Sequence, residues 1–169
     1  GARVLDYCAG GGGKTLALAA RQDARWFAHD ADPRRMADLP ARAARAGVAV
    51  TRIEEPALSE AGPVELVLCD VPCSGSGTWR RAPDAKWRLT PERLDALCRI
   101  QTEILDRAAT LVAPGGQLVL TTCSVLRPEN EAQADGFLQR HAGWRETMRR
   151  RWPVSPDGDG FFLAGFQRP

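Results

Sequence analysis

Two cysteines in this sequence stand in loops rich in small polar residues, at positions where a thiol could react. Cys73 follows an apolar run and Asp70, and Cys123 follows a second apolar run further along the chain. A thiol close to helix N-termini and basic side chains has a lowered pKa, and its thiolate is a strong nucleophile at neutral pH. Cys69 and Cys98 instead fit the buried structural role that is usual for a single cysteine. We therefore expect chemistry at Cys73 and Cys123.

A glycine tract at residues 10–13 follows the first apolar run and precedes Lys14. A P-loop needs glycine where Cys8 stands, and the G-x-G-x-x-G pattern of dinucleotide-binding proteins is also absent. What remains is a tight turn that offers backbone N–H groups at a helix N-terminus. Asp30, after the second apolar run, can accept both hydroxyls of a ribose. The pair favours an adenosine-bearing ligand without pyrophosphate, such as S-adenosylmethionine; a structural turn and a helix-capping aspartate are the alternative.

Apolar runs and helical patterns alternate along the chain, which predicts an α/β domain with a doubly wound, mostly parallel sheet. Strands are expected over residues 3–7, 25–29, 48–53, 64–69, 117–122 and 161–166, and helices over 14–20, 33–46, 91–113 and 128–141, with a long loop over 71–87. In such sheets, ligands bind beyond the carboxyl ends of the strands. The loops that carry the glycine tract, Asp30, Cys73 and Cys123 should therefore meet at one edge.

The composition bounds the class of protein. With 169 residues, 44% hydrophobic and 26% charged, the chain should form one globular domain, which excludes disordered and collagen-like proteins. Its apolar runs fall far short of the roughly 18 residues of a membrane span. Five cysteines without a C-x-x-C pair fit neither a secreted disulfide framework nor a zinc site. We expect a soluble, cytoplasmic monomer with no metal and no membrane partner.

Positive charge is concentrated although the net charge is only +2. Residues 79–88 and 140–152 each combine arginines with tryptophans, a combination that suits phosphate contact and base stacking. Solvated helix ends or loops are the alternative for both segments. The chain has only two lysines, Lys14 and Lys86, and a compact ammonium is not interchangeable with a guanidinium.

Four motifs in order along the chain resemble the catalytic domain of the Nop/Sun family of RNA (cytosine-5) methyltransferases, of the RsmB type. They are residues 5–9 with 12–15 (LDYCA, GGKT), 70–75 with 80–87 (DVPCSG, RRAPDAKW), 122–124 with 129–131 (TCS, ENE), and 159–164 (DGFFLA). The resemblance implies a seven-stranded Rossmann-like methyltransferase sheet over residues 1–169. Because the chain starts just before its first expected strand, we expect a fragment of a longer protein that lacks N-terminal RNA-binding elements.

The resemblance also implies a reaction. Cys123 would be the nucleophile that adds to carbon 6 of cytosine, so that carbon 5 takes the methyl group of S-adenosylmethionine, and Cys73 would assist the later elimination. Asp70 would hydrogen-bond the N3 and amine edge of the base, with Lys14 orienting Asp70 or the base. The target must be a single-stranded or flipped-out cytosine. Ribosomal RNA is favoured over transfer RNA as the partner.

The same resemblance carries over a set of cofactor-binding residues: Cys8, Ala9, Gly10, Gly11, Gly12, Gly13, Lys14, Asp30, Glu55 and Asp70. Two of these positions depart from the family. Gly10-Gly11 replaces the usual Ala-Pro, so we expect a looser loop and weaker cofactor binding. The family's aspartate toward adenine has no clear counterpart, since both Glu54 and Glu55 stand nearby; we favour Glu55.

Two other functions remain open at this point. An amino-methyltransferase would have Asp/Asn-Pro-Pro and an aromatic residue in place of the sequence after Asp70, which argues against it. A catalytically silent RNA-binding module would keep the fold; retention of both thiols counts against it. In the segment after Cys123, Asn130 could brace the loop, whereas Glu129 and Glu131 are equally explained as acidic residues in a first helical turn.

Overall fold

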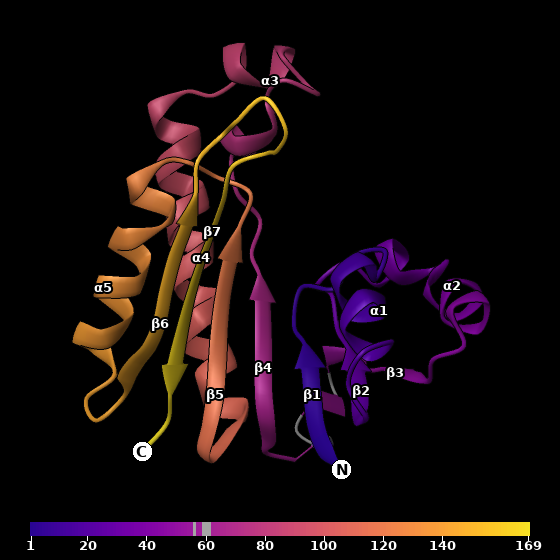
Figure 1. The fold of residues 1–169 in the computed structure, drawn as a ribbon. Helices are drawn as coiled ribbons and strands as arrows, with labels where there is room; N and C mark the ends of the chain where they lie inside the picture. Colours follow the sequence, from indigo (N-terminus) through magenta and orange to yellow (C-terminus); the bar gives the residue numbers. More distant parts are fainter. Residues whose placement is uncertain (56, 59–61) are drawn as a thin grey trace.

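In this computed structural model, which describes residues 1–55, 57–58 and 62–169, the described strands form one seven-stranded sheet (Figure 1). The order is β3-β2-β1-β4-β5-β7-β6; β7 pairs antiparallel with both β5 and β6, and the other described pairings are parallel. The strands are β1 (Ala2–Asp6), β2 (Ala24–Ala28), β3 (Val50–Arg52), β4 (Val64–Asp70), β5 (Val112–Thr122), β6 (Arg145–Trp152) and β7 (Phe161–Gln167). The predicted doubly wound, mostly parallel α/β sheet is confirmed.

Helices pack against the sheet and bury two separate hydrophobic cores. The helices are α1 (Gly13–Ala19), α2 (Leu39–Ala46), α3 (Asp84–Trp87), α4 (Pro91–Leu111) and α5 (Glu131–Arg140). Successive side chains of a strand point to opposite faces, so Phe27 and Ala28 of β2 enter different cores. Phe27 joins the larger core, with Leu105 of α4 and Phe137 of α5, whereas Ala28 packs with Met36 before α2. Figure 1 shows α1 and α2 beside β1 to β3, and α4 and α5 beside the other strands.

The parallel strands deliver their carboxyl ends to one edge of the sheet. β1 ends at Asp6, β2 just before His29 and Asp30, β4 at Asp70 and β5 at Thr122. The arrowheads of β1, β4 and β5 point toward the same end of the molecule in Figure 1. The loops that follow these strands therefore converge, as the alternation of strands and helices predicts.

The helix predicted over residues 33–46 is broken. Residues Pro33–Met36 form a 3-10 turn, and α2 begins only at Leu39. Pro40 accounts for the break, because a proline inside a helix has no N–H to donate and its ring clashes with the preceding turn. Pro40 is the second residue of α2, where the backbone N–H would have no partner within the helix, so its lack of an N–H costs nothing there.

Two other boundaries differ from the prediction. β5 begins at Val112, which pairs with Val64, and a register shift accommodates the Pro-Gly-Gly segment before the predicted part of the strand. The helix predicted from residue 128 begins at Glu131, after a 3-10 turn over Arg127–Glu129. The predicted loop over 71–87 contains α3 and a 3-10 turn over Ser76–Thr78.

The basic segment after residue 140 is a strand that sequence analysis did not identify. β6 lies at the edge of the sheet, and all eight of its residues are exposed. Arg149 pairs with Asp135 and Glu146, and Arg151 with Glu131. Charged residues on an edge strand oppose pairing with other chains. In the described part of the chain, no helix is long and apolar enough to cross a membrane.

Candidate active site

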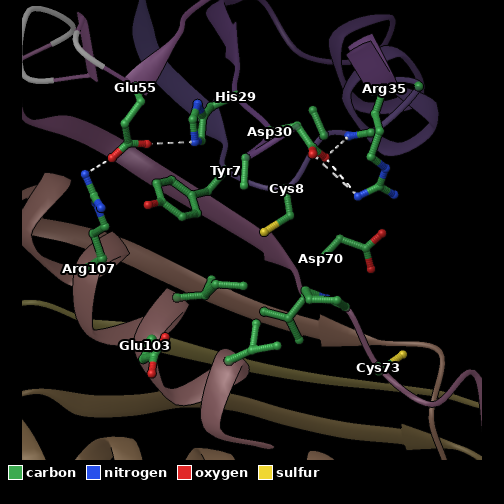
Figure 2. Close-up of a pocket in the computed structure, with 18 of the residues that line it drawn as sticks. Tyr7, Cys8, His29, Asp30, Arg35, Glu55, Asp70, Cys73, Glu103 and Arg107 are labelled. Carbon is green, nitrogen blue, oxygen red and sulfur yellow. Dashed lines mark hydrogen bonds and ion pairs between the residues drawn. The ribbon is translucent and has the colours of Figure 1, made fainter. Parts of the chain in front are cut away.

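A cavity of about 560 Å³ opens at the carboxyl ends of β1, β2, β4 and β5. Figure 2 shows Cys8, Asp30, Asp70 and Cys73 around it, with Arg107 reaching in from α4. Cys123 also lines the cavity. Loops far apart in the sequence thus meet where the strand order predicted them to meet.

The two thiols that sequence analysis singled out lie in contact. Cys73 Sγ and Cys123 Sγ are 3.5 Å apart, and both side chains are partly buried. The hydrogen bond between them lowers the pKa of Cys123 to about 7, with help from the nearby Lys14 ammonium. The same bond, followed by burial, raises the pKa of Cys73 well above its usual range. Any thiolate that the pair carries near neutral pH is therefore at Cys123, beside a protonated Cys73.

Asp70 and Lys14 form an ion pair beside the thiols. Lys14 Nζ lies 2.6 Å from Asp70 Oδ2, and Thr121 Oγ1 donates to Asp70 Oδ1 at 2.9 Å. The two partners hold the carboxylate in one orientation at the end of β4. Lys14 therefore contacts Asp70 directly, although its own side chain does not line the cavity.

The glycine tract forms the turn between β1 and α1. Gly10 and Gly12 adopt positive φ angles of 51° and 77°, which favour glycine. Ala9, Gly10 and Gly11 line the cavity, and so does Cys8, whose pKa burial raises well above the usual range. Gly12 and Gly13 do not line it.

The tract is held from outside by α2. Arg42 donates a hydrogen bond to the Gly11 carbonyl, and a Cβ atom on Gly11 would lie 2.7 Å from Arg42 Nη1. A Cβ on Gly12 would collide with Leu39. The glycines thus allow α2 to approach the loop closely, and Arg42 supplies a tether that the sequence did not indicate.

Asp30 is almost fully buried, with 4% of its surface exposed. Its Oδ2 accepts from the Gly10 N–H at 2.9 Å, and its Oδ1 accepts from the Asp32 N–H at 3.0 Å. Arg35 Nη1 donates to Oδ2 at 3.2 Å, and Figure 2 shows the arginine beside this carboxylate. Arg35 is 61% exposed, so this arginine can move away from the carboxylate when a ligand needs it.

Glu55, rather than Glu54, lines the cavity. One of its carboxylate oxygens lies 3.3 Å from His29 Nε2, and the other pairs with Arg107 (Figure 2). Burial lowers the pKa of His29, against the opposing effect of the contact between its Nδ1 and the Ile53 carbonyl. Tyr7 packs against the His29 ring, with centroids 5.0 Å apart. This end of the cavity is aromatic and carries a carboxylate.

Of the residues that follow Cys123, Glu129 has a larger role than the sequence suggested. It is fully buried, and its carboxylate contacts both cysteine loops rather than capping a helix. Asn130, the single asparagine of the chain, accepts from Thr122 Oγ1 at 2.5 Å and donates to the Ser124 carbonyl at 2.9 Å. These contacts agree with the bracing role expected of Asn130.

The basic and aromatic segment at residues 79–88 contains α3, and Ala85 and Arg88 line a smaller pocket together with Cys73. Arg80 and Arg81 pair with Asp159, and Arg88 pairs with Asp84. Trp87 is 82% exposed, and Lys86 Nζ lies 5.4 Å from its ring. The arginines are thus partly committed to structure, whereas Trp87 is available to a ligand. In the described part of the chain, no group of three or more potential metal ligands is assembled.

The sequence is similar to those of known RNA methyltransferases. Residues 1–167 match the family model described as 16S rRNA methyltransferase RsmB/F. A probable ribosomal RNA small subunit methyltransferase B of Synechocystis is 37% identical over 192 residues, which cover 98% of this chain and 43% of the relative. The ribosomal RNA small subunit methyltransferase B of Salmonella arizonae is 37% identical over 178 residues, with 97% and 42% covered.

Solved structures share the fold of this chain. The crystal structure of PH0851 aligns with a TM-score of 0.88 and 33% identity, over 99% of this chain and 43% of that one. NSun6 from Pyrococcus horikoshii, solved with SFG, aligns with a TM-score of 0.85 and 23% identity, over 99% and 48%. This second likeness concerns the fold alone. The chain spans about two fifths of the length of the curated relatives.

Proposed function

This chain belongs to the RsmB/F family of 16S rRNA methyltransferases, and we propose that it transfers a methyl group from S-adenosylmethionine to carbon 5 of a cytosine in ribosomal RNA. Residues 1–169 would be the catalytic domain of a longer protein. The observation that carries the proposal is the thiol pair, Cys73 and Cys123, at the edge of the cavity beside Asp70. Cytosine carbon 5 is unreactive until a nucleophile adds to carbon 6, and a thiolate is suited to that addition.

S-adenosylmethionine is the cofactor of this family, and it supplies an electrophilic methyl group. The cavity of about 560 Å³ lies within the range of roughly 300–1,000 Å³ usual for small-molecule sites. We assign the ribose hydroxyls to Asp30, which requires Arg35 to move aside. Glu55, with Tyr7 and His29 beside it, is assigned to the adenine end. The backbone of residues 8–11 would line the middle of the ligand, and Asp70 would lie near its methionine end.

We assign the covalent step to Cys123. Its thiolate forms a bond from Sγ to carbon 6, and the electron pair of the 5,6 double bond makes carbon 5 nucleophilic. After carbon 5 has gained the methyl group, elimination removes its hydrogen as a proton and breaks the carbon–sulfur bond. The products are 5-methylcytosine, S-adenosylhomocysteine, a proton and the regenerated Cys123 thiolate. Cys73, which lies 3.5 Å from Cys123, is placed to assist this elimination.

Asp70 and Lys14 would serve the base. Asp70 would hydrogen-bond the N3 and exocyclic amine edge, where charge changes as the adduct forms. The 2.6 Å contact with Lys14 supports this assignment, because it leaves the carboxylate little freedom to turn. Since both side chains are about a third exposed or more, the ion pair adds little stability, and its value lies in orientation.

The target base must leave a stack or lie in a single strand before its carbon 6 can reach a protein thiol. The exposed ring of Trp87 offers a surface for a displaced or neighbouring base. Ribosomal RNA is proposed as the substrate because the curated relatives are named as ribosomal RNA methyltransferases.

Covalent trapping tests the proposal. The protein is incubated with S-adenosylmethionine and ribosomal RNA fragments, and adducts are separated under denaturing conditions. Cys73→Ala should accumulate a protein–RNA adduct because elimination is impaired, whereas Cys123→Ala should form none. Cys98→Ala, a change at a thiol that does not line the cavity, should behave like the wild type. If S-adenosylmethionine binds and no variant ever forms an adduct, the two-thiol mechanism is wrong and a silent RNA-binding module becomes the better interpretation.

A further inference from the structure

A buried carboxylate connects the two cysteine loops from behind. Glu129 has no exposed surface, and it lies in the 3-10 turn that precedes α5. It does not line the cavity assigned to the cofactor. Its side chain lies where the loop after β4, the loop after β5 and helix α4 meet.

Each oxygen of Glu129 accepts two hydrogen bonds. Oε1 accepts from the Ser74 backbone N–H at 2.7 Å and from Gln101 Nε2 at 3.2 Å. Oε2 accepts from Ser74 Oγ at 2.5 Å and from Ser124 Oγ at 2.6 Å. Ser74 follows Cys73 and Ser124 follows Cys123, so the carboxylate binds the residue next to the cysteine on each loop.

The four donors explain why a carboxylate occupies this position. A buried charge is costly unless hydrogen bonds compensate it, and an ionised carboxylate is an acceptor with about four sites. Among the described residues, no lysine, arginine or histidine forms an ion pair with Glu129. An amide would keep only one acceptor oxygen, and its NH2 group would face either the Ser74 N–H and Gln101 Nε2, which donate, or the two serine hydroxyls, which would have to reverse their hydrogen bonds. The site is therefore built for a negative, acceptor-only group that joins two loops.

We infer that Glu129 is a positioning residue for the two-thiol chemistry, because it fixes Ser74 and Ser124 and thereby sets the separation of the Cys73 and Cys123 sulfurs. The effect of Glu129 on catalysis rests on the proposed function, whereas its effect on the separation of the two sulfurs does not. The negative charge of Glu129 also contributes to the raised pKa of Cys73, after the larger effects of the Cys123 hydrogen bond and burial. It thus helps to keep Cys73 protonated beside the Cys123 thiolate.

Disulfide formation between the two thiols gives a readout that needs neither RNA nor cofactor. The protein is equilibrated with mixtures of reduced and oxidised glutathione, and the Cys73–Cys123 disulfide is quantified by mass spectrometry. The equilibrium constant measures how well the fold holds the two sulfurs together. In Glu129→Gln we expect it to fall by about tenfold or more, because the neutral amide has one acceptor oxygen instead of two and holds the two loops less tightly.

Glu131→Gln is the matched control, since Glu131 lies two residues on and pairs with Arg151 instead of the cysteine loops. It should keep the wild-type equilibrium constant. Ser124→Ala removes one of the four donors to Glu129, together with the contacts of the Ser124 hydroxyl to the Leu126 N–H and the Ser76 hydroxyl. It leaves the other three donors in place and should give a smaller fall, which keeps the inference testable if Glu129→Gln does not fold. Binding of S-adenosylmethionine should be unchanged in Glu129→Gln, and adduct formation in the Cys73→Ala background should slow by about tenfold.

Two results would separate the inference from the proposed reaction. A folded Glu129→Gln variant whose thiols still pair like those of the wild type would overturn the positioning role. A wild-type protein that shows Glu129-dependent thiol pairing but never forms an RNA adduct would overturn the proposed reaction, and the geometric role of Glu129 would stand.

Discussion

Cys73 Sγ and Cys123 Sγ lie 3.5 Å apart because the two loops that carry them leave neighbouring parallel strands at the same edge of the sheet. The loops are also joined by their backbones, since the Gly77 N–H donates to the Cys123 carbonyl at 2.9 Å. The consequence is a shared proton. Cys73 keeps it and donates to the Cys123 thiolate, so that only one of the two sulfurs is nucleophilic near neutral pH.

The shared proton predicts the pH dependence of alkylation. In the wild type, the rate at Cys123 should rise with a midpoint near pH 7, since its pKa is lowered to about 7 by Cys73. In Cys73→Ala that donor is lost, so the midpoint should move up toward the usual value for cysteine, and the rate at pH 7 should fall by about tenfold. Iodoacetamide labelling followed by peptide mass spectrometry, from about pH 5.5 to about pH 9.5, measures both.

Cys98→Ala provides the control for this titration, because the Cys98 sulfur contacts the Pro128 carbonyl and neither thiol of the pair. Its Cys123 profile should match that of the wild type. An unchanged midpoint in Cys73→Ala would contradict the shared proton.

Gly77 should be one of the least replaceable residues of the site. A Cβ atom there would lie 2.7 Å from the Gly160 carbonyl carbon and 2.9 Å from the Cys123 carbonyl oxygen, and backbone cannot yield as a flexible side chain can. Gly77→Ala should therefore lower the free energy of unfolding by about 3 kcal/mol. Gly13→Ala is the contrast, since nothing lies within 4 Å of its Cβ position at the start of α1. It should stabilise by roughly 0.5–1 kcal/mol; urea denaturation of both compares them, and equal effects would contradict the packing argument.

The sequence predicted the edge of the sheet where the site lies, because apolar runs that end in a polar residue mark both the strand and its carboxyl end. Asp70 and Cys123 could be assigned in this way. β6 could not, because all of its residues are exposed and no apolar alternation marks it. A charged edge strand is recognised only when its partner, here β7, is known.

The part of the site that escaped prediction depends on contacts across the chain. Glu129 reads locally as an acid at a helix start, and its partner Ser74 lies 55 residues away. The tether from Arg42 to Gly11 spans 31 residues and has no local pattern either. Motifs therefore indicated which residues react, whereas tertiary packing decides which residues hold them.

The hydrogen bond from Arg42 to the Gly11 carbonyl should affect the affinity for S-adenosylmethionine. Gly10-Gly11 was expected to loosen the loop, but Arg42 holds the Gly11 carbonyl from α2. Arg42→Ala should weaken S-adenosylmethionine binding by about fivefold, which corresponds to roughly 1 kcal/mol for one hydrogen bond that orders the loop. Arg45→Ala, on the same helix, is the control, and calorimetric titration measures both. Equal affinities in the two variants would show that the tether does not matter for binding.

The buried Asp6 side chain should make the free energy of unfolding depend on pH. Its side chain is 1% exposed at the end of β1, Thr15 Oγ1 donates to Oδ2 at 2.6 Å, and Oδ1 finds no partner among the described residues. Burial raises the pKa of Asp6 to about 6, against the opposing Thr15 hydrogen bond, and the nearby charge of Asp70 adds to the increase. Between about pH 4 and pH 6 the folded protein thus keeps a proton that the unfolded chain has lost.

The stabilisation from this proton is complete below about pH 4 and disappears as the pH rises through 6, a loss of about 3 kcal/mol for a shift of about two pKa units. Asp6→Asn removes the titration while its amide oxygen still accepts from Thr15. The variant should therefore be more stable than the wild type at pH 7, and the difference should shrink toward pH 4. Urea denaturation at several pH values measures the two curves; parallel curves would show that Asp6 titrates alike in the folded and unfolded states.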